Sequence, residues 1–194
     1  MKTKLSILVG CALLFIGCSS KEAPKPKPNM PKVTGECNIQ DTDAPKWVCT
    51  GGDVKGYITA VGSAKPTPLG FNYQLSEAKA LARDEIAKQI QVKVKNMFKT
   101  YMATTGAKTD SVEKATEYVS KQLTKQTLIG SKQLNMWIAP DKTIFVLVGV
   151  PINANEVKQV IKSSLNNKEA LWQKLEADKA QKELDEAIEK EFGN

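Results

Sequence analysis

The sequence predicts an α+β domain in which a long amphipathic helix lies across a small antiparallel sheet. Residues 57–64 form a run rich in aromatic and β-branched side chains, which is typical of a strand. From Tyr73 to Met102, apolar side chains recur at the three-to-four spacing of one helical face. Residues 134–138 and 143–150 are apolar runs joined by a short turn, which indicates a hairpin. The predicted order is strand, helix, helix, strand, strand.

The first strand is bounded by residues that interrupt regular structure. Gly51 and Gly52 break the chain before it, and Pro66 and Pro68 force a loop after it. We therefore expect the strand to lie within residues 56–64.

The long helix has one apolar face and one charged face. Arg83, Lys88 and Lys95 fall off the apolar face, so a sheet or another helix must cover that face. The apolar face consists of Leu75, Ala78, Ala82, Ile86, Ile90, Val94, Phe98 and Tyr101.

A second helix follows a polar break at residues 104–106. Asp110 is followed three positions later by Glu113, which resembles a capping box at a helix N-terminus. The apolar face of this helix consists of Val112, Ala115, Val119 and Leu123.

The hairpin turns at residues 139–142, where Pro140 and Asp141 are typical turn residues. Side chains alternate along a strand, so Trp137 points to the face opposite Met136 and Ile138. One sheet face packs on the long helix, and the face with Trp137 needs another cover. A second copy of the chain or the predicted helix at residues 154–165 could supply it.

Two further helices are predicted near the C-terminus. Asn153 or Asn155 can cap a helix that contains Val157, Val160, Ile161 and Leu165. Residues 166–194 are rich in glutamate, lysine and alanine, and their apolar stripe is interrupted at residues 178–182. This pattern predicts a charged C-terminal helix that contacts a neighbour only intermittently.

The N-terminus has the features of a lipoprotein signal peptide. Lys2 and Lys4 precede an apolar segment, residues 5–16, that is too short to span a bilayer. The sequence Leu14-Phe15-Ile16-Gly17-Cys18 resembles a bacterial lipobox, which makes Cys18 the expected acylation site, carrying fatty acyl chains such as palmitate. A match ending at Cys11 would leave a very short apolar segment, and a soluble secreted protein is the other alternative.

Acylation of Cys18 would explain the lysine- and proline-rich residues that follow it. Residues 23–28 alternate proline with alanine or lysine and cannot form helix or sheet, so they predict an extended stalk. The stalk lysines either rest on anionic headgroups or are simply solvated.

The expected organisation has four parts. We expect a signal peptide at 1–17, the acylated cysteine and stalk at 18–44, a folded domain at 45–165 and a charged helix at 166–194.

Export also bears on the remaining cysteines. Cys11 leaves with the signal peptide and Cys18 is acylated, so Cys37 and Cys49 remain. These two can pair in an oxidising compartment, although nothing in the sequence requires it.

Composition argues against several classes of function. The 194-residue chain has no histidine, which removes Ser-His and Cys-His nucleophile pairs and imidazole metal sites. The adjacent carboxylates of Asp84 and Glu85 fit a solvated helix face better than an acid/base pair. The net charge of +7 is spread along the chain without a basic, aromatic cluster. We therefore expect no enzyme, no cofactor, no metal and no nucleic-acid partner.

Several segments together resemble a known family. Pro45 and Trp47, then residues 57–64, 77–87 and 144–150, are similar in order and spacing to the lipoprotein-20 family of bacterial outer-membrane lipoproteins. The resemblance covers about residues 44–161 and implies a dodecin-like fold. It also implies an envelope protein without catalytic residues, in a family that includes lipoproteins of the flagellar motor disk.

The leading hypothesis is a structural, self-associating lipoprotein on the periplasmic side of the outer membrane. Ser19, rather than Asp, after the acylated cysteine favours the outer membrane by the lipoprotein sorting rule. The expected partners are the membrane, other copies of the chain, and flagellar motor or other envelope proteins. The alternative is a surface adhesin or ligand-binding module, whose aromatic candidates are Trp47, Tyr57, Trp137 and Trp172.

Overall fold

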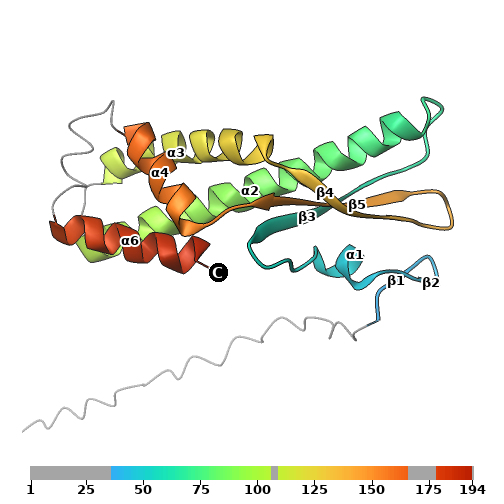
Figure 1. Cartoon of the computed structure of the whole chain (residues 1–194), viewed down its shortest axis with the longest axis horizontal. Coiled ribbons are helices and arrows are strands. Elements are labelled where there is room, and N and C mark those ends of the chain that lie inside the picture. Colours follow the sequence, from blue (N-terminus) through green and yellow to red (C-terminus); the bar gives the residue numbers. More distant parts are fainter. Residues whose placement is uncertain (1–35, 106–108, 166–177, 194) are drawn as a thin grey trace, which may run out of the picture. The chain divides into compact units, whose positions relative to one another are not determined.

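The computed structural model describes residues 36–105, 109–165 and 178–193 (Figure 1). The predicted signal peptide, Cys18 and most of the stalk lie outside these residues, as does Trp172. The side chain of Asp110, the first residue of the predicted capping box, also lies outside the described part.

The observed elements confirm the predicted α+β class and its strand-helix-helix-strand-strand order. A small N-terminal unit, residues 36–52, precedes these five elements, and two helices follow them. The elements are β1 (Asn38–Ile39), β2 (Thr42–Asp43), α1 (Lys46–Thr50), β3 (Tyr57–Ala64), α2 (Phe71–Thr105), α3 (Thr109–Ile129), β4 (Lys132–Ile138), β5 (Ile144–Pro151), α4 (Ala154–Leu165) and α6 (Asp178–Phe192).

The main sheet is antiparallel, with strand order β3-β5-β4. β5 is central: it pairs with β3 from Tyr57↔Pro151 to Ala64↔Ile144 and with β4 along its other side. A register shift between Gln133 and Asn135 marks a bulge in β4. β3 and β4 are therefore the two edges of the sheet.

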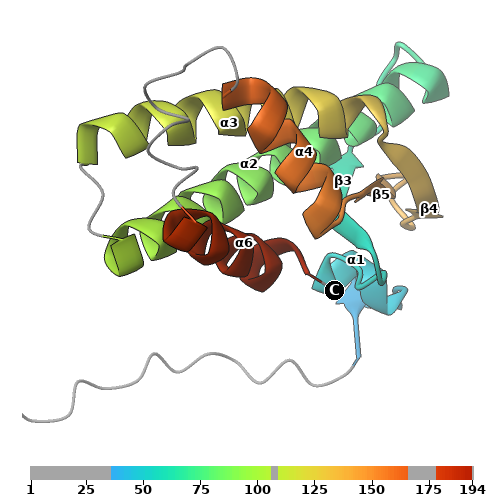
Figure 2. The ribbon, with the colours of Figure 1, turned by 60° about the vertical axis from the view of Figure 1, so that its left-hand side comes forward.

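One face of the sheet is covered by the N-terminal half of α2, mainly over β3 and β5 (Figures 1 and 2). The approach is close because small residues meet there. A Cβ atom at Gly62 would overlap the Ala78 carbonyl oxygen and the Ala82 nitrogen. Gly62, Ala78 and Ala82 are all buried, so the backbones of β3 and α2 lie in direct contact.

The C-terminal half of α2 packs against helices instead. It contacts α3 and α6, and α4 packs on both of these helices (Figure 2). The sequence predicts only intermittent contact for the C-terminal helix, but α6 buries one full face. Leu184, Ala187, Ile188 and Phe192 belong to the same apolar core as α2.

The second sheet face is covered by the N-terminal unit, not by the predicted helix at residues 154–165. That helix, α4, packs on α3 and α6. The sheet is covered by α1 and the loop after it, where a Cβ atom at Gly52 would lie 2.7 Å from the Leu147 Cδ1 atom. The expectation that α4 could cover this face is therefore wrong, because the loop at Gly52 occupies it.

Candidate functional site

The β4 edge exposes backbone groups that no other described strand pairs. The Ala139 N–H donates to the Thr143 carbonyl at 2.9 Å, so Ala139 faces β5. Successive residues of a strand alternate in direction, so Trp137 also faces β5, whereas Met136 and Ile138 face outward. The Met136 N–H donates to the Asn135 Oδ1 atom at 2.8 Å rather than to a strand. The Ile138 N–H and the Met136 and Ile138 carbonyls therefore lie along an open edge.

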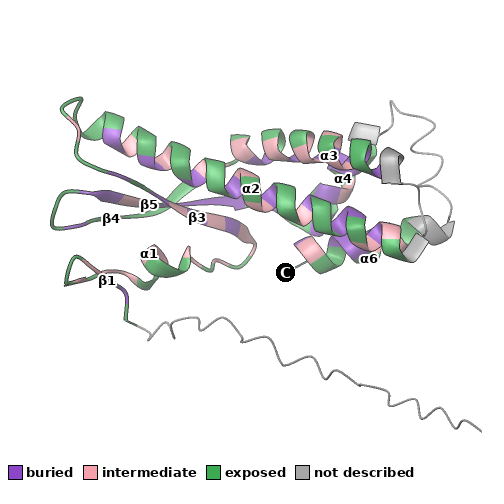
Figure 3. Ribbon diagram, turned by 180° about the vertical axis from the view of Figure 1, so that it is seen from behind, coloured by how far each residue is buried: buried purple, intermediate pink, exposed green. Residues whose placement is uncertain are grey.

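The side chains of this edge are apolar and exposed. Leu134, Met136 and Ile138 expose 36%, 36% and 44% of their surface. Met136 pairs with Val146 and Ile138 with Ile144, so the side chains of Met136 and Ile138 lie on the α2 face of the sheet. Leu134 lies beside Gly149 on the other face. Figure 3 shows β4 largely exposed beside the buried β5.

The beginning of α2 flanks this strand. Arg83 Nε donates to the Ser131 Oγ atom at 2.8 Å, which places that side of α2 beside the start of β4. Leu75 precedes Arg83 by about two turns, and Phe71 is the first residue of the helix. Leu75 packs on the core, and Phe71 is 49% exposed. α3 lies along the C-terminal half of α2 only, so it does not cover this region (Figure 1).

We define the β4 ledge as Met136 and Ile138 together with the outward backbone of β4. It is an apolar surface beside open hydrogen-bonding groups. Such a surface can bind another strand, but it carries no group that could act as a nucleophile or a general acid.

The β3 edge is flanked by side chains from α2 and α6, and one of its carbonyls is already bonded. Gln89 Nε2 donates to the Thr59 carbonyl at 3.1 Å, which occupies an acceptor of the edge strand. Lys93 Nζ donates to the Glu191 carbonyl at 2.6 Å and lies 5.6 Å from the centre of the Phe192 ring. These contacts tie the end of α6 to α2 beside the strand.

A groove of about 550 Å³ remains along β3. Its walls are the loop after α1, the edge of β3, and side chains of α2 and α6, including Asp53, Glu85 and Glu191. The Thr59 hydroxyl donates to the Gly52 carbonyl at 2.7 Å, so the loop is tied to the strand at this groove.

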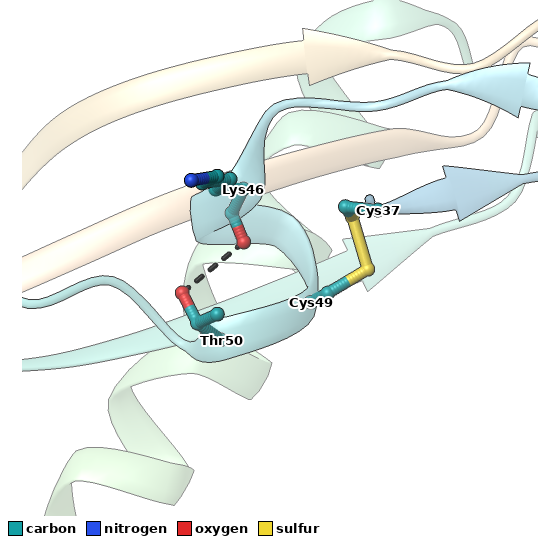
Figure 4. The surroundings of a disulfide bond; sticks show 4 residues. All are labelled: Cys37, Lys46, Cys49 and Thr50. Atoms are coloured by element: carbon teal, nitrogen blue, oxygen red, sulfur yellow. Dashed lines mark hydrogen bonds between the residues drawn. A yellow bond between two sulfur atoms is a disulfide. The ribbon is translucent and has the colours of Figure 1, made fainter. Parts of the chain in front are cut away.

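The predicted partners Cys37 and Cys49 lie together in a disulfide of the N-terminal unit (Figure 4). Their Cα atoms are 5.8 Å apart, and the two positions are separated by 12 residues. Cys49 lies in α1, which also contains the Thr50 hydroxyl bond to the Lys46 carbonyl at 3.1 Å. The disulfide thus fixes α1 and its following loop against the chain that leads in from the stalk.

The N-terminal unit is also bound to the tip of the hairpin. Gln40 Nε2 donates to the Asp141 Oδ2 atom at 2.7 Å, and Thr143 donates to the same carboxylate from its N–H and its hydroxyl. The Gln40 hydrogen bond, followed by those from Thr143, lowers the pKa of Asp141 below its usual value of 3.8. Asp141 is therefore a carboxylate at neutral pH.

The other residues singled out from the sequence have structural surroundings. Trp137 is half-buried on the outer sheet face, with its ring 5.5 Å from that of Phe145. Trp47 and Tyr57 are also half-buried. Asp84 is exposed, and Glu85 forms an exposed ion pair with Lys88 at 3.3 Å.

The sequence interpretation missed the importance of Met136 and Ile138. Their alternation was visible, but it was assigned to the covered face of the sheet. Only the position of α2 over β3 and β5 shows that β4 extends beyond the helix.

The described residues contain no group of three or more acidic, cysteine or histidine side chains that could hold a metal ion. Within the same residues, no helix is long and apolar enough to cross a membrane.

Residues 45–151 match the model of the LPP20 lipoprotein family. The chain belongs to this family. The match covers β3, α2, α3, β4 and β5, and it confirms the resemblance seen in the sequence. No curated protein matches the chain. Membership makes the chain an envelope lipoprotein that is anchored at a membrane.

Proposed function

We propose that this lipoprotein has a structural role in the envelope and works by self-association through the β4 ledge. The observation that carries the proposal is the open edge of β4 with its exposed apolar side chains, in a sheet whose other edge is flanked by α2, α6 and the loop at Gly52. Unpaired strand edges are sites at which another chain can extend a sheet.

Membrane anchoring would strengthen such an interaction. Acyl chains on Cys18 would hold the copies at one surface, which raises their effective concentration without adding contacts. The proline- and lysine-rich residues 23–28 would keep the folded domain away from the headgroups. The predicted stalk extends to residue 44, but its last part contains β1 and β2 and belongs to the folded domain.

The finer assignment follows the sequence interpretation. We place the anchored domain on the periplasmic side of the outer membrane after removal of the signal peptide at 1–17. A disk around the flagellar motor is the kind of assembly that the proposed role fits. We propose no catalytic activity, because Asp84 and Glu85 lie on a solvated helix face.

Light scattering on soluble protein lacking residues 1–33 tests self-association. The expected mass exceeds that of a monomer and increases with protein concentration. Met136→Lys should return the mass to that of a monomer, because a charge on the ledge opposes burial. Val92→Lys is the matched control: Val92 is 57% exposed on α2 between the buried Ile90 and Val94. A monomeric wild-type protein at every concentration would overturn the proposal.

A further inference from the structure

We infer that the self-contact is a two-fold antiparallel pairing of β4 with β4 of a second copy, with the axis at Trp137. This inference rests on the proposed self-association and specifies its geometry. It would join the sheets in the order β3-β5-β4-β4-β5-β3.

The outward backbone groups of β4 complement themselves in this register. Met136 of one copy lies opposite Ile138 of the other. Each Ile138 N–H can then donate to the Met136 carbonyl of the other copy, so both copies provide one donor and one acceptor. In the same pair, the Ile138 carbonyl of the other copy would replace the Asn135 Oδ1 atom as the acceptor of the Met136 N–H, so pairing exchanges one hydrogen bond within the strand for one between the copies.

The adjacent registers use these groups less well. A two-fold axis at Met136 would place Ile138 opposite Leu134, which lies in the bulge and interrupts the ladder. An axis at Ile138 would place Met136 opposite Pro140, which has no N–H to donate. The register centred on Trp137 avoids both problems.

The part of the edge that pairs in this register is uncharged. Residues 135–139 of the two copies lie opposite one another, and none of them carries a charge, so no charged side chain enters the new strand pair. Lys132 of one copy and Lys142 of the other oppose each other only beyond the ends of this stretch, where both are exposed.

The apolar side chains of the ledge gain neighbours in the same pairing. Met136 and Ile138 lie on the α2 face in both copies, so each would pack beside the other across the new strand pair. The exposed surface of both side chains should therefore decrease.

Cysteine cross-linking of the full-length protein in intact cells tests this register. In the double variant Met136→Cys/Ile138→Cys, each new cysteine lies directly opposite one of the other copy, at about 5.5 Å between Cα atoms. That separation permits a disulfide. In either single variant, the two new cysteines are offset along the strands by about 7 Å, which places their Cα atoms beyond the disulfide limit of roughly 7 Å.

The expected result in the double variant is a dimer band on a non-reducing gel that disappears when the disulfide is reduced. The wild-type protein and Val92→Cys should not show this band, which controls for exchange with Cys37 and Cys49. Strong cross-linking of a single variant would overturn the register.

Failure of the double variant to cross-link, in protein that still self-associates in solution, would overturn the β4 pairing but leave the proposed function intact. If the soluble protein is a monomer, both proposals fail. Cross-linking of the double variant to a different protein would show that the edge binds another chain, and it would overturn the inference.

Discussion

The two edges of the main sheet differ in how many contacts they make with other parts of the fold. At β3, Gln89 binds the Thr59 carbonyl, and the loop at Gly52 binds the Thr59 hydroxyl. At β4, the outward groups of Met136 and Ile138 meet no other described strand, and both side chains are exposed. The comparison shows that neighbouring elements can restrict access to one edge of a small sheet while the other edge remains available for pairing.

The covering of β3 depends on how closely α2 approaches it. The start of α2 is in backbone contact with β3 at Gly62, and later residues of the same helix reach the edge. β4 lies on the far side of β5, so the same helix does not cover it to the same extent.

The largest expected effect comes from separating α2 from β3. Gly62→Ala places a methyl group against the carbonyl oxygen of Ala78 and the backbone nitrogen of Ala82. These are backbone atoms of a helix, so they cannot move aside as the end of a flexible side chain would. We expect a loss of about 3 kcal/mol or more in the free energy of unfolding, measured by urea denaturation. The neighbouring Ser63→Ala is the control, because Ser63 is exposed. Equal stability of the two variants would contradict the close contact.

Removal of the disulfide should have the next largest effect. The loop closed by Cys37 and Cys49 is short, and the chain-entropy relation gives about 3 kcal/mol for a loop of this size. Cys37→Ser/Cys49→Ser should lower the free energy of unfolding by up to that amount. It should also expose the outer sheet face near Leu147, which light scattering would detect as species larger than a dimer.

The control for the disulfide prediction is the wild-type protein under reducing conditions, which should behave like the double variant. An unchanged unfolding curve after reduction would show that the N-terminal unit is held by its other contacts, such as Gln40 with Asp141.

The smallest expected effect comes from removing the side chain that occupies a carbonyl of the β3 edge. Gln89→Ala removes the donor to the Thr59 carbonyl and should cost about 1 kcal/mol of stability. Gln91→Ala is the matched control, because Gln91 is exposed on the same helix. The loop at Gly52 and α6 still flank β3, so the association measured by light scattering should not change. New large species in Gln89→Ala alone would show that this one side chain keeps the edge closed.

Much of the fold was predictable because local patterns report it directly. The periodic apolar positions from Leu75 to Tyr101 predicted α2, and alternation around Pro140 and Asp141 predicted the β4-β5 hairpin. The capacity of Cys37 and Cys49 to pair was also visible from their number and spacing, although not required by them.

The part of the site that was missed depends on distant residues. The sequence showed that Met136 and Ile138 alternate with Trp137, but both sheet faces and both edges remained equivalent at that level. Gly52 covers the face that carries Trp137 through a contact with Leu147, far away in sequence.

The sequence by itself determined the family and the types and order of the elements from β3 onward, because these depend on short-range periodicity and on local motifs. The short elements β1, β2 and α1 were not predicted. The tertiary structure alone decided which sheet edge is flanked by other elements and which residues of α6 are buried. Gln89 reaches Thr59 only because α2 crosses the sheet at that angle, and Phe192 is buried only because α6 returns to α2 beside Lys93. Burial and edge pairing are properties of the assembled chain, since they depend on contacts between segments that no local pattern specifies.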